Sequence, residues 1–361
     1  MDESCAIPAG RSRRPWRAGV LLLCAGCLAG LVLWVGKGAL ARREPLFRGK
    51  PESEWIKNLK YWDDEQVKEW RTYGEEGVQV LIRGLQNANR PGERAYRKYN
   101  RVMPAFLRGW LPAPKPDSTR VTRMCLVSLL ASLGNAASNA VPIMLRTVRD
   151  DESDSVRQGA LNYFNSTEDD HCLLNQLPPA QKLALLPALI RGIQDPGNWG
   201  LRNNAAISLR YYPEQRERVA PVLVKALQDS QPQVRLLAAE ALNRVDPAAA
   251  KKAGATAIVA AIAKNPDDQI AAHAVAALRR PGTEPELAVP VLLECLQSTN
   301  TLVACEAVWA LQWAPQEFAA YSETIIPALR SAAQRKDNVG GYAKVALSKW
   351  MPQPGPAPGA K

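Results

Sequence analysis

Apolar residues recur with helical spacing through most of the second half of the chain. In the segment that starts at Ala255, the residues Ile258, Val259 and Ile262 fall at i, i+1 and i+4, which is one face of a helix. Polar turn residues then interrupt the pattern, and an alanine-rich apolar stretch follows. The same order occurs in copies that start at Ala140, Leu185, Val219, Ala255, Ala288 and Ile325. Each copy predicts a pair of helices joined by a short turn.

A proline, or in one copy a threonine, marks the first helix of each pair. These positions are Pro142, Pro187, Pro221, Thr256, Pro290 and Pro327. Because proline fixes φ and lacks an N–H, we expect it in the first helical turn. The positions recur about every 34 to 45 residues, and helix pairs of this length bury their shared apolar face by stacking. The sequence therefore predicts an all-α fold, a right-handed α-solenoid of about seven two-helix repeats, of which the uninterrupted ones occupy residues 135–351.

The repeats resemble HEAT repeats, in the form shared with bacterial phycobilisome-lyase-like proteins. The resemblance covers about residues 140–350 and depends on the order apolar-Pro-apolar-apolar, then Asp, then Val-Arg, then an alanine-rich stretch. It implies an inter-repeat ladder of aspartates and arginines, formed here by Asp150, Arg157, Asp195, Arg202, Asp229 and Arg235. Ala271, Ala304 and Gly340 replace the arginine in later copies, so we expect the ladder to end before the C-terminus.

An N-terminal helical cap is predicted over residues 51–75. Its aromatic residues, among them Trp62 and Trp70, are expected to seal the end of the stack. Asp63 and Gln66 have the spacing of a capping box at the start of its second helix.

The first repeat, residues 76–134, is predicted to be interrupted by a basic insertion at residues 88–120. The insertion combines an aromatic stripe with basic residues, and its candidate contact residues are Arg94, Tyr96, Arg97, Lys98, Tyr99, Arg101, Phe106, Arg108 and Trp110. We favour packing of the stripe on the first repeats; contact with an anionic membrane surface, a partner protein or nucleic acid are the alternatives. Residues 352–361 are rich in proline and glycine and predict a disordered tail.

Residues 18–36 carry no charge and follow a basic N-terminal tail, residues 1–17. As a helix they extend about 28 Å, close to the thickness of the hydrocarbon core of a bilayer. A cleaved signal peptide that ends near Ala41 and a lipoprotein signal that ends at Cys27 are alternatives, and we favour an uncleaved transmembrane anchor. The short basic tail resembles a bacterial signal-anchor, which predicts the inner membrane with the repeats outside the cytoplasm.

Charge and candidate chemistry narrow the function classes. The formal net charge is +11, but the surplus lies in residues 1–50 and 87–123, and the repeat body is nearly neutral. The basic balance is therefore a weak argument for nucleic acid. The chain has two histidines and no HExxH, GxSxG or phosphate-binding glycine motif, so we predict no catalytic, metal or cofactor site. The cysteines of the repeat body are expected to be buried thiols, with a Cys295–Cys305 disulfide as the alternative.

The predicted function is a membrane-tethered scaffold for protein–protein interaction. Solenoids offer a groove lined by the second helix of each pair, and the candidate groove residues are Arg202, Asn203, Arg235, Glu240, His273, Glu306 and Trp309. An unidentified protein is the expected partner, and residues 18–36 provide the membrane contact. The resemblance also admits a tetrapyrrole lyase or chaperone. A nucleic-acid-binding helical-repeat protein is less favoured because the repeat body is nearly neutral.

Overall fold

The computed structural model describes residues 44–89, 99–100, 102–104, 119–165, 173–265, 267–313 and 316–350. They belong to two compact units that divide between Lys57 and Asn58. The predicted tail 1–17, the predicted anchor 18–36, the predicted C-terminal tail 352–361 and most of the predicted insertion lie outside the described residues.

The first unit contains a hairpin and one short helix. Strands β1 (Leu46–Phe47) and β2 (Lys50–Pro51) pair antiparallel, and helix α2 (Glu52–Lys57) follows directly. Trp55 Nε1 donates a hydrogen bond to the Phe47 carbonyl oxygen at 2.9 Å, and the two rings meet edge to face. The hairpin was not predicted, and it places Trp55 in this unit, apart from the cap residues that follow.

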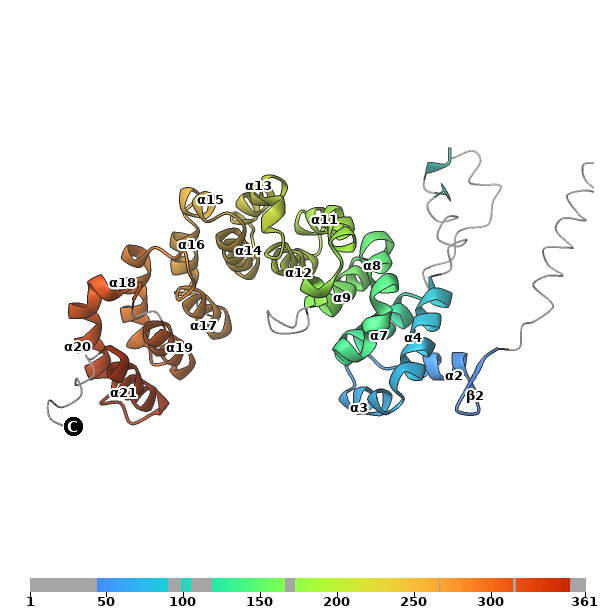
Figure 1. The fold of residues 1–361 in the computed structure, drawn as a ribbon, viewed down its shortest axis with the longest axis horizontal. Helices are drawn as coiled ribbons and strands as arrows, with labels where there is room; N and C mark the ends of the chain where they lie inside the picture. Colours follow the sequence, from blue (N-terminus) through green and yellow to red (C-terminus); the bar gives the residue numbers. More distant parts are fainter. Residues whose placement is uncertain are drawn as a thin grey trace, which may run out of the picture. The chain divides into compact units, whose positions relative to one another are not determined.

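The regular elements described in the second unit are all helices (Figure 1). They are α3 (Asp64–Thr72), α4 (Gly74–Ala88), α7 (Arg120–Leu133), η1 (Gly134–Ala140), α8 (Val141–Asp150), α9 (Asp154–Asn165), α10 (Leu173–Gln176), α11 (Pro179–Ile193), α12 (Trp199–Leu209), η3 (Pro213–Gln215), α13 (Arg216–Ala226), α14 (Pro232–Val245), α15 (Pro247–Lys252), α16 (Ala255–Ile262), α17 (Asp268–Ala277), α18 (Pro285–Leu296), α19 (Thr301–Trp313), η4 (Ala319–Tyr321), α20 (Ser322–Ala332) and α21 (Asn338–Trp350).

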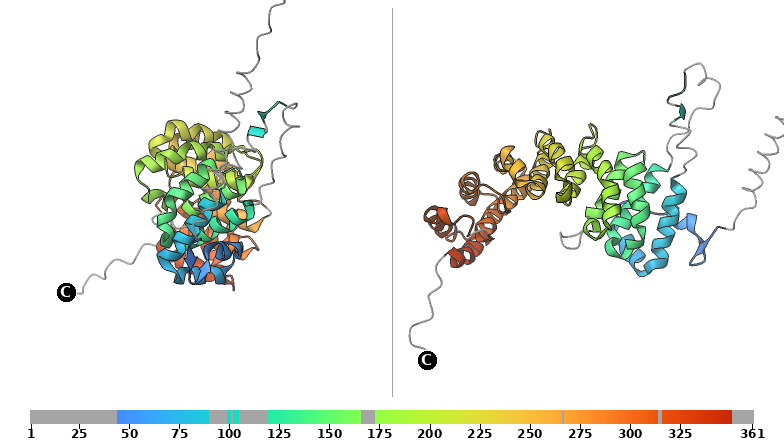
Figure 2. Two further views of the ribbon diagram at one scale, coloured as in Figure 1. Left: turned by 90° about the vertical axis from the view of Figure 1, so that its right-hand side faces the viewer. Right: turned by 45° about the horizontal axis from the view of Figure 1, so that its top comes forward.

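Seven helix pairs follow one another in the described part of this unit: α4 with α7, α8 with α9, α11 with α12, α13 with α14, α16 with α17, α18 with α19 and α20 with α21. The second helices contact one another from pair to pair, from α7 through α9, α12, α14, α17 and α19 to α21, and the first helices form a second layer (Figures 1 and 2). This is the two-layer stack of an all-α solenoid, as predicted.

The apolar face of each second helix forms the core. In α14, the residues predicted to point inward, among them Val234, Leu237 and Leu242, are buried. Leu236 and Ala239 are also fully buried, because α14 contacts helices of its own pair and of both neighbouring pairs. The many alanines let these helices approach closely, and each fully buried leucine contributes about 1.5–3 kcal/mol.

Most of the marker prolines do not lie in the first turn, which corrects the sequence prediction. Pro142 is at the start of α8, whereas Pro187, Pro221, Pro290 and Pro327 lie inside their helices. These helices begin earlier because the residues before the proline are themselves good helix formers, such as Arg216 and Glu217 in α13. A proline at such a position removes one backbone hydrogen bond from the helix.

Among the described residues, the segment Arg120–Asp150 is apolar and long enough to cross a membrane. It comprises α7, η1 and α8, and 50% of its most apolar window is buried in the protein. We therefore assign it to the core of the first two helix pairs, and it does not bear on the predicted anchor.

Candidate functional site

Arginines from second helices tie the turns of neighbouring repeats together. Arg202 donates from Nε and Nη2 to the two carboxylate oxygens of Asp229 in the next repeat, at 2.7 and 2.9 Å. Its Nη1 donates to the backbone carbonyl of Asp195 in its own repeat at 3.0 Å. Arg202 is buried by these contacts, so it belongs to the ladder and is not free to contact a partner in the groove.

The ladder begins one repeat earlier than predicted, and one of its aspartates is shifted by a residue. Arg123 on α7 donates to both carboxylate oxygens of Asp151, at 3.0 and 3.2 Å, and both side chains are almost fully buried. Asp150, the predicted member, lies at the surface and pairs with Arg149. Spacing could not decide between the two aspartates, because Asp229 precedes its helix arginine by six residues, as Asp151 does, whereas Asp195 precedes its own by seven, as Asp150 does.

Arg157 and Arg235, which precede and follow Arg202 in the ladder, form weaker links between repeats than Arg202 does. Arg157 lies 3.7 Å from Asp195 of the next repeat and donates to the Asp151 carbonyl of its own. Arg235 donates only to backbone oxygens of its own turn, those of Asp229 and Ser230. In the following repeat Asn265 occupies the aspartate position, so Arg235 meets no carboxylate there.

Three of the predicted groove residues meet near α14, α17 and α19. His273 and Glu306 line a cavity of about 460 Å³ together with Gln233. His273 Nδ1 is 3.2 Å from Gln233 Nε2, and His273 Nε2 is 3.8 Å from the buried carboxylate of Glu240. Glu240 in turn pairs with Arg280 at 2.9 Å. Burial raises the pKa of the Glu306 carboxyl.

The other two predicted groove residues lie elsewhere. Trp309 packs against Tyr342 of the last helix pair, with ring centroids 5.2 Å apart. Asn203 has a buried side-chain oxygen that receives no hydrogen bond from the described residues. Neither lines the cavity beside His273. Of the candidate insertion residues only Tyr99 is described, and its side chain is exposed; Arg94, Tyr96, Arg97, Lys98, Arg101, Phe106, Arg108 and Trp110 lie outside the described residues.

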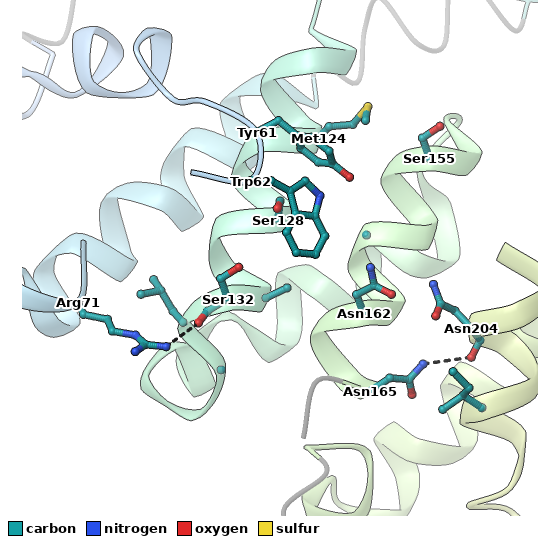
Figure 3. Close-up of a pocket in the computed structure, with 15 residues that line it drawn as sticks. Tyr61, Trp62, Arg71, Met124, Ser128, Ser132, Ser155, Asn162, Asn165 and Asn204 are labelled. Carbon is teal, nitrogen blue, oxygen red and sulfur yellow. Dashed lines mark hydrogen bonds between the residues drawn. The ribbon is translucent and has the colours of Figure 1, made fainter. Parts of the chain in front are cut away.

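A larger cavity, of about 500 Å³, lies between the loop before α3 and the second helices α7, α9 and α12 (Figure 3). Its lining combines aromatic, aliphatic and small residues with serines, asparagines and one arginine: Tyr61, Trp62, Arg71, Met124, Ser128, Ala131, Ser132, Leu133, Gly134, Ser155, Gly159, Asn162, Asn165, Asn204 and Ile207. We call it the aromatic–amide cavity. None of these residues was among the predicted site residues.

The loop that carries the aromatic wall is fixed by the start of α3. Asp63 accepts hydrogen bonds from the backbone N–H groups of Glu65 and Gln66, at 3.1 and 3.0 Å. The predicted capping box is modified, because the Gln66 side chain accepts from Lys60 N–H and donates to the Asn58 carbonyl, both at 3.0 Å. These contacts hold both sides of the loop, so its two aromatic rings keep their position at the cavity.

Trp62 adopts an unusual conformation within this loop. Its φ is +55°, a left-handed value that costs a non-glycine residue about 1–2 kcal/mol. Its side chain is 67% exposed, and its ring stands at 86° to that of Tyr61. Only Trp70 among the predicted cap tryptophans of this unit is buried, against Tyr73. The expectation that Trp62 seals the stack is therefore wrong, because the loop presents its ring at the surface.

The opposite wall consists of hydroxyl and amide groups. Figure 3 shows Ser128 and Ser132 from α7, Asn162 from α9 and Asn204 from α12 around one space. The Asn204 residue is only 8% exposed. Its backbone oxygen accepts from Asn165 Nδ2 at 3.1 Å and from Ser208 Oγ at 2.9 Å, whereas its side-chain amide bonds to none of the described residues. The backbone is thus fixed and the amide is left for a ligand.

The chemistry of the lining is that of binding, not of proton transfer. Among the described lining residues there is no carboxylate, histidine, cysteine or lysine, and in the described part of the protein no cluster of potential metal ligands occurs. The single charged group is Arg71, which donates to the Ser132 carbonyl at 3.1 Å. Sequence reasoning missed this cavity because isolated serines and asparagines form no motif; the two adjacent asparagines in an alanine-rich second helix, Asn203 and Asn204, were the available signal.

The stacked helix pairs and the arginine–aspartate ladder define a HEAT-type α-solenoid. In agreement, residues 186–279 match the family model for HEAT repeats. This part of the chain therefore consists of HEAT repeats. No curated protein matches the chain.

Two solved structures are similar at low identity. An engineered protein is 18% identical and has a TM-score of 0.40, with 59% of this chain and 96% of that protein covered. YibA of Escherichia coli is 15% identical and has a TM-score of 0.44, with 85% of this chain and 98% of YibA covered. Similarity at this level adds nothing about the site.

Proposed function

We propose that the protein is a membrane-tethered scaffold that binds a partner protein on the face formed by its second helices. HEAT repeats commonly have a scaffolding role in protein interaction, and a solenoid presents a long continuous surface for it. The predicted anchor, residues 18–36, would supply the tether. The basic N-terminal tail favours the bacterial inner membrane, with the repeats outside the cytoplasm.

The observation that carries the proposal is the aromatic–amide cavity. Asn204 is only 8% exposed, and its side-chain amide lines the cavity without a bond to a described residue, so the amide can bond a ligand there. Two exposed aromatic rings stand opposite it, and such rings are enriched among residues that dominate binding energy in protein interfaces. A bound partner would satisfy the amide and cover the rings.

The lining also favours protein over nucleic acid. Binding of nucleic acid depends on several lysines or arginines that neutralise phosphates, whereas Arg71 is the single cation in the described lining. The near-neutral charge of the repeat body as a whole also speaks against nucleic acid.

Photo-crosslinking in intact membranes tests the scaffold function. A photoreactive phenylalanine analogue replaces Trp62 in the full-length protein, and the matched control carries it at Trp199, a 53% exposed tryptophan that does not line the cavity. We expect a defined protein adduct at position 62 and none at 199. The adduct should disappear when Asn204→Leu is added. Equal labelling at both positions, or none at position 62, would contradict the proposal.

The tether is tested separately by extraction of membranes with alkaline carbonate. The full-length protein should stay in the membrane pellet, and a variant without residues 18–36 should move to the supernatant. Release of the full-length protein would rule out an uncleaved anchor. Protease added to intact cells reports the side: cleavage of the repeats only after the outer membrane is opened supports the assigned orientation.

A further inference from the structure

The aromatic–amide cavity carries information about the chemistry of its occupant. Its lining residues come mainly from the loop before α3 and three second helices, and Arg71, on α3, is the only charged one among those described. A cationic ligand group would lose water here without gaining a counter-charge, because the described lining has no carboxylate. An anionic group could pair with Arg71 alone, whose Nη2 donates to the Ser132 carbonyl. We therefore expect an occupant that is uncharged along most of this surface.

The direction of the polar groups indicates an extended occupant. Ser128 lies on α7, Asn162 on α9 and Asn204 on α12, which are second helices of three successive repeats. Packed helices lie about 8–10 Å apart, so the three groups span roughly 16–20 Å. A polypeptide in the polyproline II conformation covers that distance with about five to seven residues, at 3.1 Å each.

The hydrogen-bonding capacity fits a polypeptide backbone. An asparagine amide both donates and accepts, and a serine hydroxyl does the same. Neither Asn204 nor Ser128 has a side-chain bond to a described residue, and both side chains are largely buried beside the cavity. Backbone carbonyl and N–H groups are uncharged and recur at every residue of a protein segment, so they can bond to each of these side chains in turn.

The known modes of peptide recognition can then be compared with this surface. Addition of a strand needs an exposed sheet edge, and the second unit has no strand among its described residues. An amphipathic helix needs a continuous apolar groove, whereas serine and asparagine side chains interrupt the apolar lining here. A phosphorylated or acidic motif needs a cluster of arginines. The remaining mode is a polyproline II segment on exposed aromatic rings, which Tyr61 and Trp62 provide.

We propose that the aromatic–amide cavity binds an uncharged, proline-rich segment of the partner protein in the polyproline II conformation. A proline ring packs on Trp62, and backbone groups of the segment bond to Asn204 and Ser128. The left-handed φ of Trp62 is the conformational cost of holding the indole ring in place before binding. This inference rests on the proposed function, since it names the chemistry of the segment that the scaffold holds.

A peptide library screened against the full-length protein in lipid nanodiscs tests the inference. The probes are acetylated and amidated peptides of about eight residues, with all amino acids varied at each position. Proline should be enriched among bound peptides, and charged residues depleted. The best peptide should then bind about tenfold or more weakly to Trp62→Ala and to Asn204→Leu, the range seen for key interface residues. Binding to Trp199→Ala, altered outside the cavity, should be unchanged.

Two variants separate binding from folding. Trp62→Gly lacks the same ring as Trp62→Ala but accepts the left-handed φ without strain. It should therefore unfold at a higher urea concentration than Trp62→Ala while losing peptide affinity to the same extent. Asn204→Asp keeps the shape of the side chain and adds a charge to the cavity, and it should weaken binding as Asn204→Leu does.

The outcomes distinguish failure of the proline-rich segment from failure of the proposed scaffold function. The proline-rich segment is overturned if charged residues, or no residues at all, are enriched among the bound peptides. It is also overturned if a neutral oligosaccharide such as maltohexaose binds and loses as much affinity in Trp62→Ala. If a protein adduct nevertheless forms at position 62 in membranes, the scaffold function stands alone. If neither adduct nor peptide is found, both fail.

Discussion

Two adjacent aspartates offer a direct test of the ladder, because they differ in surroundings and not in chemistry. Asp151 receives both bonds from Arg123, and the two side chains are 1% and 2% exposed. Asp150 pairs with Arg149 at 2.8 Å, but there the side chains are 40% and 54% exposed. The perturbation is the same at both positions, Asp→Asn, which keeps the shape of the side chain and removes its charge.

The expected magnitudes follow from the burial of each pair. In Asp151→Asn the guanidinium of Arg123 stays buried without its counter-charge, and breaking such a pair costs about 3–5 kcal/mol. Arg123 keeps its bond to Thr119 Oγ1, and Asn can still accept from Ser153 N–H as Asp151 does, so we expect the lower end, about 3 kcal/mol. An exposed pair contributes about 0–1 kcal/mol, so Asp150→Asn should change little.

Urea unfolding of the full-length protein, followed by far-ultraviolet circular dichroism, measures both variants. Because repeat arrays can unfold locally, hydrogen exchange of the amides in α7 and α8 provides a second measurement. Asp151→Asn should lower the unfolding midpoint and speed exchange in these helices, whereas Asp150→Asn should do neither. Equal shifts in the two variants would refute the argument that the buried clamp, and not aspartate itself, stabilises this turn.

Three further predictions concern single positions. Burial opposes ionisation of Asp229, but its hydrogen bonds from Arg202 and a backbone N–H, with nearby charge, outweigh this and lower the pKa below 3.8. Its stabilisation is therefore complete well above that value and is lost as pH falls through the lowered pKa, so wild type should lose more stability than Asp229→Asn between about pH 4 and 2 in urea titrations. Burial, with the charge of Glu294, raises the pKa of the Cys295 thiol to about 11, so Ellman's reagent at about pH 8 should not react with it until urea unfolds the protein. Gly340→Ala should lower the melting temperature, because its Cβ would lie 2.1 Å from a backbone oxygen, whereas Gly341→Ala, with nothing within 4 Å, should be neutral or stabilising by up to about 1 kcal/mol.

The fold was predictable because each repeat has the same pattern of apolar residues and must bury them against its neighbours. The alanine-rich stretch and the turn before it recur six times, and periodic apolar positions identify helices whatever the detailed packing. Helix boundaries were harder to predict. Pro221 alone indicates a first helical turn, yet α13 already begins at Arg216, five residues before the proline. The hairpin at Leu46–Pro51 left no periodic signal, because two-residue strands are too short to show one.

The candidate site was harder to predict because it depends on contacts between distant segments. From the sequence, Trp62 is expected to be a core residue because it lies in an aromatic-rich stretch. The contacts of Asp63 and Gln66 hold the loop in a conformation that exposes its ring. Asn204 becomes a candidate once Asn165, 39 residues earlier, donates to its backbone oxygen and its side chain is left facing the cavity. His273 and Glu306, by contrast, follow from the repeat register alone, and the structure brings them to one cavity.

The last repeat shows why the ladder changes form at the C-terminal end. Arg335 occupies the position of Asp229 in its repeat, and its Nη1 donates back to the Leu296 and Ser298 carbonyls of the preceding repeat, at 3.3 and 2.9 Å. Elsewhere the helix arginine reaches forward to the turn of the next repeat, as Arg202 reaches Asp229, and the corresponding position at this boundary is Ala304. The backward bonds of Arg335 therefore link the two repeats where the forward arginine is missing. On the following helix, Gly340 faces the Arg335 carbonyl so closely that a larger residue would not fit.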